Sequence, residues 1–358
     1  MIYAPYASAA FQKWFGERLN ILSSDVSHFM GGNLVALILG GGYGRGEGGV
    51  VQENGQEKPY NDIDLTIIVN EPGSVDRHGL EEIAKNTAKS LGIEVDFSRP
   101  LAPSDVENWP NSLMWHDLLN GHIVLFGDTD ILTRLAPPEL ARPLDSVEAL
   151  RLLLNRGSGL LWAMLMEREY AKAPDSDFIR RNAYKCILAL GDSILIASGR
   201  YSTQYLGRAE TLAEVCVLKP EACCLDIEDR YRAALTFKFT PDTAPDLDTS
   251  ISGLRQISEA WISVFLYLER SRLTTSTIEL KKIEEYLTWK GVREPAQNGA
   301  ACWPRNVVQN VMLGRLSLRY PREYLYRRLP ALLSAEKTNP GGWSRDVQSY
   351  LRIWRRFN

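Results

Sequence analysis

Residues 34 to 69 combine two apolar runs with a glycine-dense turn, and no other stretch constrains the fold as strongly. Leu34–Leu39 is almost wholly apolar, as expected of a strand buried on both faces. Seven of the ten positions from Gly40 to Gly49 are glycine, which permits positive φ and a close approach of the backbone to a ligand. Consecutive N–H groups in such a turn can surround phosphate oxygens. The stretch therefore predicts a strand, a phosphate-binding turn and a second strand.

The second apolar run begins with two aspartates in the sequence NDIDLTIIV. Side chains alternate between the faces of a strand, so Asp62 and Asp64 share one face while Ile63 and Leu65 point into the core. Neighbouring carboxylates repel each other unless a cation neutralises them, and Mg²⁺ typically uses one or two carboxylates together with substrate phosphates. A phosphate-binding turn beside such a pair predicts phosphoryl or nucleotidyl transfer.

The turn GGYGRGE followed by DIDL resembles the catalytic motif of the nucleotidyltransferase superfamily typified by DNA polymerase beta. This motif is similar to that of the PII uridylyltransferase and to those of stand-alone bacterial nucleotidyltransferases. The resemblance implies transfer of an NMP from an NTP to a hydroxyl with release of pyrophosphate, and dependence on Mg²⁺, with Mn²⁺ as the alternative. Nineteen residues separate Gly42 from Asp62, more than in the uridylyltransferase, and we assign the excess to an exposed hairpin loop at residues 50–59.

The resemblance also implies the residues of a metal site. Asp62 and Asp64 would hold Mg²⁺ against the phosphates of the nucleotide. Residues 93–98 alternate apolar and polar, which predicts a half-buried strand whose polar face carries Glu94 and Asp96. We take Asp96 as the third carboxylate, which would share a metal and help deprotonate the acceptor hydroxyl, with Glu94 as the alternative. A solvated outer strand face is the other interpretation of this pattern.

Nucleotide binding is assigned to the turn and to one distant cation: Gly41, Gly42, Gly44, Arg45 and Lys185. The glycines would let the backbone approach the triphosphate. Arg45 can pair either with a phosphate or with Glu47 in the same turn, and both roles stay open. The assignment of Lys185 is what the resemblance implies, because a lysine in the helical domain of such proteins often contacts the triphosphate. An ordinary surface charge on a helix is the competing interpretation of Lys185.

The predicted fold class is α+β, a small mixed-sheet nucleotidyltransferase domain followed by an all-helical domain. The first domain spans residues 1–135. Three prolines in residues 136–143 mark a linker. Residues 144–358 carry apolar side chains at helical spacing without a fixed repeat, which predicts a helical bundle.

The charge, cysteine and histidine content of the chain indicates where the protein acts and which partners it has. The 358 residues carry a formal net charge of −3, but ten arginines and one lysine against three acidic residues give residues 301–358 a charge of +8. Aromatic residues among these arginines favour core packing over nucleic-acid binding. Five scattered cysteines predict reduced thiols in a cytoplasmic protein, and no signal or membrane-spanning segment is evident. The four histidines show no zinc-site spacing.

We therefore predict a cytoplasmic, metal-dependent nucleotidyltransferase whose partners are an NTP and a small-molecule or protein hydroxyl acceptor. Two alternatives come from other classes of protein. One is a catalytically silent nucleotide-binding regulator that keeps the fold. The other is an RNA-binding or RNA-modifying protein that uses the basic C-terminal tail, although no recognised polynucleotide module is evident and nucleic acid is not the expected partner. The sequence predicts neither the base of the NTP nor the identity of the acceptor.

Overall fold

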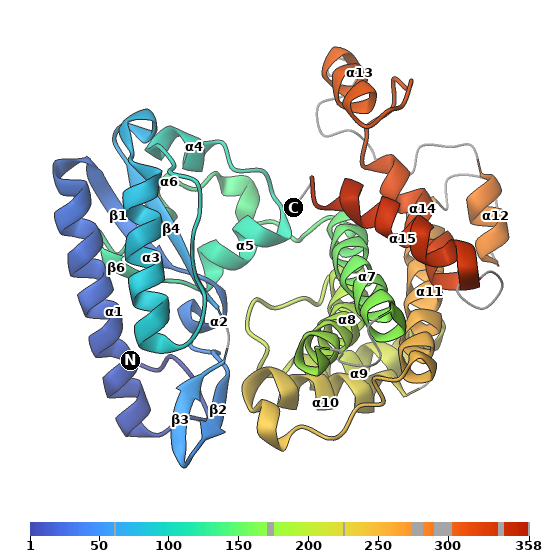
Figure 1. Ribbon diagram of the computed structural model, residues 1–358, viewed down its shortest axis with the longest axis horizontal. Coiled ribbons are helices and arrows are strands. Elements are labelled where there is room, and N and C mark those ends of the chain that lie inside the picture. Colours follow the sequence, from blue (N-terminus) through green and yellow to red (C-terminus); the bar gives the residue numbers. More distant parts are fainter. Residues whose placement is uncertain are drawn as a thin grey trace. The chain divides into compact units, whose positions relative to one another are not determined.

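The computed structural model describes residues 1–60, 62–169, 175–224, 226–273, 282–289, 303–335 and 340–356. The chain forms two compact units (Figure 1). The first comprises Met1–Asp145 together with Tyr201–Ala209 and Arg232–Pro245, and the second comprises Ser146–Arg200, Glu210–Tyr231 and Asp246–Asn358. The first unit holds a small mixed sheet and the second is helical, so the predicted α+β fold class is confirmed.

The four-stranded sheet has the order β5-β4-β1-β6. Its strands are β1 (Leu34–Leu39), β4 (Ile63–Val69), β5 (Val95–Phe97) and β6 (Ile123–Phe126). Strand β1 pairs antiparallel with β4 and with β6, whereas β4 and β5 run parallel. Strands β1 and β4 are central and, apart from Asp64 and the partly buried Val35, buried, in line with their mostly apolar sequences.

Helices cover both faces of this sheet (Figure 1). Helices α1 (Ala9–Met30) and α3 (Arg77–Leu91) pack their apolar stripes on one face, with Phe15 and Leu80 in the same buried cluster as Leu65. The opposite face is covered by α4 (Pro103–Glu107), α5 (Leu113–Asn120) and α6 (Ile131–Leu135). Short 3₁₀ turns complete the connections at Gly31–Asn33, Pro72–Ser74, Pro138–Ala141, Pro220–Ala222 and Pro241–Thr243.

The polar stretch after the glycine turn forms a two-stranded antiparallel hairpin, β2 (Val50–Glu53) and β3 (Gln56–Pro59). Asn54 and Gly55 connect its strands with φ of 53° and 77°, values typical of a two-residue hairpin turn. The hairpin expected at these residues is therefore confirmed.

The helices of the second unit begin with α7 (Ser146–Glu169) and α8 (Ser176–Ala197), which pack against each other and against α11 (Ile251–Leu273). The other helices are α9 (Arg208–Leu218), α10 (Ile227–Phe239), α12 (Ile283–Thr288), α13 (Trp303–Met312), α14 (Glu323–Ala335) and α15 (Pro340–Trp354). The boundary between the units falls within α9 and α10. Of the C-terminal aromatic residues, Tyr326, Trp343 and Tyr350 are buried, which supports core packing for this part of the tail.

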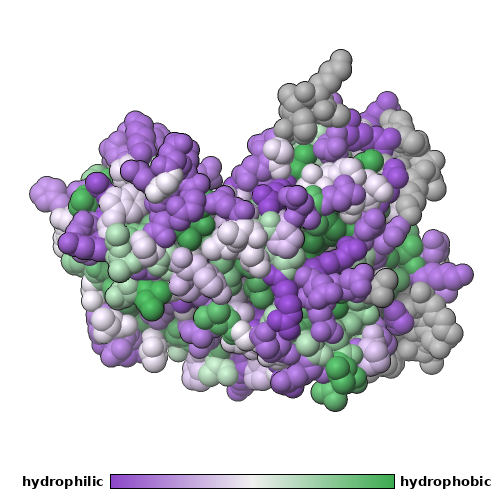
Figure 2. All heavy atoms as spheres, turned by 90° about the horizontal axis from the view of Figure 1, so that it is seen from below, coloured by the Kyte–Doolittle hydropathy of each residue, from purple (hydrophilic) through white to green (hydrophobic). Residues whose placement is uncertain are grey.

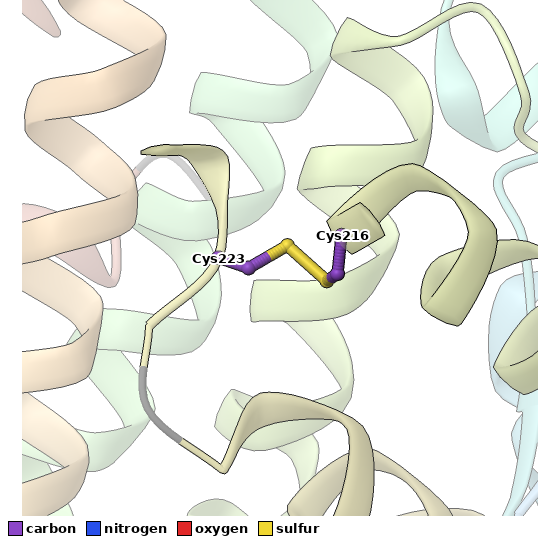
Figure 3. Close-up of a disulfide and its surroundings, with 2 residues drawn as sticks. All are labelled: Cys216 and Cys223. Carbon is purple, nitrogen blue, oxygen red and sulfur yellow. A yellow bond between two sulfur atoms is a disulfide. The ribbon is translucent and has the colours of Figure 1, made fainter. Parts of the chain in front are cut away.

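The prediction that the cysteines are reduced thiols is wrong for one pair. Cys216, in the last turn of α9, forms a disulfide with Cys223 just after the next 3₁₀ turn, with 5.6 Å between their Cα atoms (Figure 3). The chain reverses direction between them, so two residues seven apart in sequence meet, which spacing alone did not indicate. Cys186 and Cys224 are free, and Cys302 lies outside the described residues.

Replacing both Cys216 and Cys223 by serine is expected to lower the stability of the second unit by about 2 kcal/mol, since the bridge closes a short loop and removes little entropy from the unfolded chain. Urea unfolding of the oxidised protein and of the double variant measures the difference. Cys224→Ser, beside the bridge, is the matched control and should leave the transition unchanged. Equal stability of oxidised wild type and double variant would contradict the expectation.

On the face shown in Figure 2, hydrophilic side chains are interspersed with small apolar areas. Among the described residues, no helix combines the length and the apolar character that crossing a bilayer requires.

Candidate active site

The parallel pairing of β4 with β5 brings two of the predicted carboxylates together. Asp64 lies directly opposite Asp96 in the register, so both side chains project from the same face of the sheet. Ile63 and Leu65 are buried on the other face, whereas Asp62 and Asp64 are exposed. The alternation along β4 thus places the aspartates as the sequence pattern indicates.

Neighbouring negative charges affect the pKa of the Asp96 carboxyl. The pKa of Asp96 is raised, first by partial burial of its carboxyl and then by the negative charges of Asp62 and Glu94. Asp62 therefore lies close enough to Asp96 to act on it, and the register places Asp96 rather than Glu94 opposite Asp64. A concentration of negative charge on one strand face is the environment in which a divalent cation is stabilised.

Within the described part of the chain, no group of three His, Cys, Asp or Glu side chains is arranged to hold a metal ion by itself. Paired carboxylates completed by substrate phosphates are the usual surroundings of protein-bound Mg²⁺. The carboxylates of Asp64 and Asp96, with Asp62 nearby, are donors of the kind that such an ion uses.

The glycine turn packs against Asp64. After β1 the chain makes one short helical turn, α2 (Gly41–Gly44), and Gly41 has a φ of 60°. A Cβ built on Gly41 would overlap the Asp64 carboxylate, so only glycine permits this approach. Gly40 N–H donates a hydrogen bond of 2.8 Å to the carbonyl of Asp64, which fixes the turn to β4.

The glycines of the turn differ in their surroundings. Gly44 N–H donates to the carbonyl of Gly40 at 2.8 Å, and a Cβ on Gly44 would overlap the carbonyl of Leu39. Its missing side chain therefore lets the turn pack onto β1. Gly41 opens the helical turn against Asp64, whereas a Cβ on Gly42 would lie 3.3 Å from the carbonyl of Glu47.

Arg45 forms an internal ion pair. Its Nε lies 3.5 Å from Oε2 of Glu47, and both side chains are largely buried. The guanidinium carbon also lies 5.6 Å from the ring centroid of Tyr205. Of the two roles left open for Arg45, this arrangement favours pairing with Glu47 over direct contact with phosphate.

Residues 201–209 belong to the same unit as the turn and are tied to it by Glu47. Oε1 of Glu47, a residue only 2 % exposed, accepts hydrogen bonds from the backbone N–H groups of Tyr205 at 2.7 Å and Leu206 at 3.1 Å. Arg208 is 1 % exposed and donates to the carbonyls of Ser202 at 2.7 Å and Thr203 at 2.8 Å. These hydrogen bonds attach the segment to the turn and stabilise its backbone.

The same segment is anchored to α5 through Tyr201. Its hydroxyl donates to the Asp117 carboxylate at 2.9 Å and accepts from Arg208 at 3.0 Å. Gly121, which ends α5, leaves room for Arg45, because a Cβ there would overlap the Arg45 side chain. The turn, α5 and residues 201–209 therefore form one packed arrangement within the first unit.

Lys238 is a site residue that the sequence interpretation missed. It lies in the part of α10 that belongs to the first unit, and its Nζ is 3.7 Å from the position that a Cβ would take on Gly42. The same Nζ lies 4.6 Å from the ring centroid of Tyr205. Buried phenylalanines flank it at positions 237 and 239, a polar residue between two core residues that could have drawn attention to it.

Lys185, the lysine predicted to contact the nucleotide, is exposed on α8 of the second unit. The structure thus brings Asp62, Asp64, Asp96, Gly41, Gly42, Gly44 and Arg45 together in the first unit, with Lys238 beside them, and places Lys185 in the other unit.

Comparison with known proteins gives distant likenesses in structure. No family model matches the chain, and a search of curated proteins gives no match. The spectinomycin adenyltransferase AAD(9) from Enterococcus faecialis, solved with ATP and spectinomycin, is 13 % identical with a TM-score of 0.43, over 68 % of this chain and 98 % of that one. A nucleotidyltransferase-like protein from Exiguobacterium sibiricum 255-15 is 10 % identical with a TM-score of 0.25, over 73 % and 81 % of the two chains. Likenesses this distant carry no functional conclusion.

Proposed function

We propose that the protein is a metal-dependent nucleotidyltransferase that moves an NMP from an NTP to an acceptor hydroxyl and releases pyrophosphate. The observation that carries the proposal is the juxtaposition of Asp64 with Asp96 across β4 and β5, directly against the glycine turn at Gly41. Carboxylates for a hard cation and a backbone turn for phosphates are the two parts that phosphoryl and nucleotidyl transfer require.

Each part of the site has a role in this reaction. Asp62 and Asp64 would hold Mg²⁺, which when bound neutralises charge on the triphosphate. Gly41 and Gly42 leave the backbone accessible to the phosphate oxygens. Asp96, whose pKa is raised, accepts the proton of the acceptor hydroxyl, because a more basic carboxylate is a better general base.

The proposal is tested by incubating the protein with each of the four α-labelled NTPs, Mg²⁺ and candidate acceptors. Transfer of label with release of pyrophosphate supports it. NTP binding that does not depend on metal, without any turnover, would instead favour a nucleotide-binding regulator.

Lys238→Ala is expected to weaken Mg²⁺-dependent NTP binding by about tenfold, because a charge-assisted contact to phosphate contributes about 1.5 kcal/mol. Lys185→Ala, the matched control on α8, is expected to leave the affinity unchanged. Anisotropy of a fluorescent NTP measures both dissociation constants. If Lys185→Ala weakened NTP binding and Lys238→Ala did not, Lys185 would be the lysine that contacts the phosphates, as the sequence predicted.

Gly41→Ala is expected to reduce transfer on the order of a hundredfold, because its Cβ displaces the Asp64 carboxylate by roughly an ångström. Gly55→Ala in the β2–β3 turn is the matched control: it has the same kind of positive φ, 77° against 60° for Gly41, but no neighbouring atom within 4 Å. Both variants bear a similar backbone strain. Equal activities would show that close approach at Gly41 has no part in the reaction.

A further inference from the structure

Helix α13 and the loop that follows it, residues 303–322, expose their apolar side chains and bury polar ones. Asn306 and Asn310 are buried in the helix. The Asn310 amide donates hydrogen bonds to the carbonyls of Ser317 at 3.0 Å and Arg319 at 2.8 Å, which folds the loop back onto the helix. The exposed large apolar side chains of this segment are Trp303, Val308, Val311, Met312, Leu316 and Leu318.

These six side chains form the apolar patch of the segment. Leu316 is 96 % exposed and Leu318 is 66 % exposed. Moving such a side chain out of water is favourable in proportion to its apolar area. Clustered exposed apolar residues mark sites that bind a protein or a membrane, so the patch is a candidate interaction surface.

The same segment is cationic. Residues 303–322 contain four arginines and no acidic residue. Arg356 donates to the carbonyl of Met312 at 3.1 Å, which places a further guanidinium at the end of α13. Arg319 pairs with Glu323 at 3.1 Å, whereas no carboxylate among the described residues forms an ion pair with Arg305 or Arg356. The surroundings of the apolar patch therefore favour a negatively charged partner.

Arg315, directly before Leu316, lies in a group of like charges. Its guanidinium carbon lies 3.6 Å from the ring centroid of Tyr324, and Arg328 donates to the hydroxyl of the same tyrosine at 2.7 Å. The pKa of Arg315 is lowered, first by partial burial and also by the positive charges of Arg328 and Arg327. A phosphate bound to this group would reduce the repulsion between the guanidinium groups.

We propose that residues 303–322 bind the surface of an anionic phospholipid bilayer, with the apolar patch among the acyl chains and the arginines on the lipid phosphates. The proposal does not depend on nucleotidyl transfer. Helices that combine Trp and aliphatic residues with arginines bind in the plane of the membrane interface. With 10 residues, α13 is about 15 Å long, half the thickness of the hydrocarbon core, so it can lie on a bilayer but cannot span one.

The chemistry of the segment favours lipid over other partners. A second copy of the chain, docked on the same patch about a two-fold axis, would bring four arginines against four with no acidic residue in either segment. Single-stranded nucleic acid stacks its bases on aromatic rings, yet Trp303 is the one aromatic residue of the patch. A protein partner must match the shape of the surface closely, whereas fluid acyl chains accommodate a side chain as exposed as Leu316.

Sedimentation with vesicles tests the proposal, using phosphatidylcholine alone and phosphatidylcholine mixed with phosphatidylserine. We expect the wild type to bind only the mixed vesicles, and more weakly at high salt, because salt screens the arginines. Leu316→Ser combined with Leu318→Ser should weaken this binding at least about tenfold, the factor that burial of one leucine contributes. Arg305→Gln should weaken it about fivefold.

Val217→Ser combined with Leu218→Ser is the matched control and should leave vesicle binding unchanged. These side chains are also exposed, at 80 % and 72 %, and belong to the second unit but not to the patch. Equal weakening by both double variants would overturn the proposal, because the vesicles would then adhere to any exposed apolar side chain. Equal binding to both kinds of vesicle, or binding to neither, would overturn it as well.

Two further measurements distinguish the other partners. A wild-type dimer in analytical ultracentrifugation that the Leu316 and Leu318 double variant dissociates would show that the patch joins two copies of the chain, and would overturn the proposal. Binding of a labelled single-stranded RNA that competes with the vesicles, and that Arg305→Gln weakens but the leucine double variant does not, would also overturn it. No nucleotide is present in these experiments, so their outcome is independent of the proposed reaction.

Discussion

Asp64→Asn is expected to lower nucleotidyl transfer by about 10²–10³-fold and to weaken metal-dependent NTP binding, while the protein stays folded. The amide keeps the size of the side chain but removes the charge that a divalent cation requires. Losing one preorganised charge from a transfer site typically costs about 3–4 kcal/mol of transition-state stabilisation. Asp64 lies against Gly41 and is opposite Asp96 in the register, so it joins the two parts of the proposed site.

Label transfer and NTP anisotropy, each at several Mg²⁺ concentrations, measure the effect. Asp25→Asn, at an exposed position of α1, removes the same charge elsewhere in the first unit and should change neither quantity. If Asp64→Asn retained full activity and the Mg²⁺ dependence of the wild type, the aspartate pair would have no catalytic part and the proposed function would be wrong.

The central part of the fold could be predicted from the sequence because its signals are local. Strand β1 is a continuous apolar run, β4 is mostly apolar, and the glycines that follow β1 permit a tight turn. The pairing of β4 with β5 involves residues about thirty apart, and alternation fixed which residues share a face before any register was known. Alternation placed Glu94 and Asp96 on one face, but only the register of β4 and β5 shows that Asp96 is the residue opposite Asp64.

The parts that the sequence did not predict depend on contacts between distant segments. Lys238 lies near Gly42 because residues 232–245 pack with the first unit, although they fall within the helical region of the chain. The bond from Tyr205 to Glu47 joins residues 158 positions apart. No periodicity or spacing encodes such a meeting, which is why the sequence did not indicate Lys238, whereas Lys185 in the second unit stays a prediction.

The limits of the two units also depend on contacts between segments that are distant in the sequence. The first continuous segment runs to Asp145 and so includes the proline-rich residues 136–143, which the sequence predicts as a linker after residue 135. Composition also could not show that residues 201–209 and 232–245 pack with it. Both segments are short, and each lies partly within a helix whose remaining residues belong to the second unit. Helical periodicity is the same on both sides of the boundary and so carries no information about it.

Glu47→Ala is expected to destabilise the attachment of residues 201–209 to the turn by about 3–5 kcal/mol, since removing one partner of a buried ion pair leaves an uncompensated charge. Arg45 would keep a largely buried guanidinium, and the N–H groups of Tyr205 and Leu206 would lose their acceptor. Hydrogen exchange of these two amides measures the local opening, and urea unfolding measures the effect on the unit. NTP affinity should fall as well, because the ring of Tyr205 lies against Lys238.

Two further variants distinguish the loss of the hydrogen-bond acceptor of Glu47 from the loss of its charge. Glu47→Gln keeps an oxygen that can accept from Tyr205 and Leu206 but removes the charge opposite Arg45, so it should recover part of the protection of the two amides. Glu53→Ala removes an exposed carboxylate paired with Lys58 and should cost at most about 1 kcal/mol. Unchanged exchange at Tyr205 in Glu47→Ala would show that the segment is held by Tyr201 and Arg208 alone, and the link between the glycine turn and Lys238 would then not depend on Glu47.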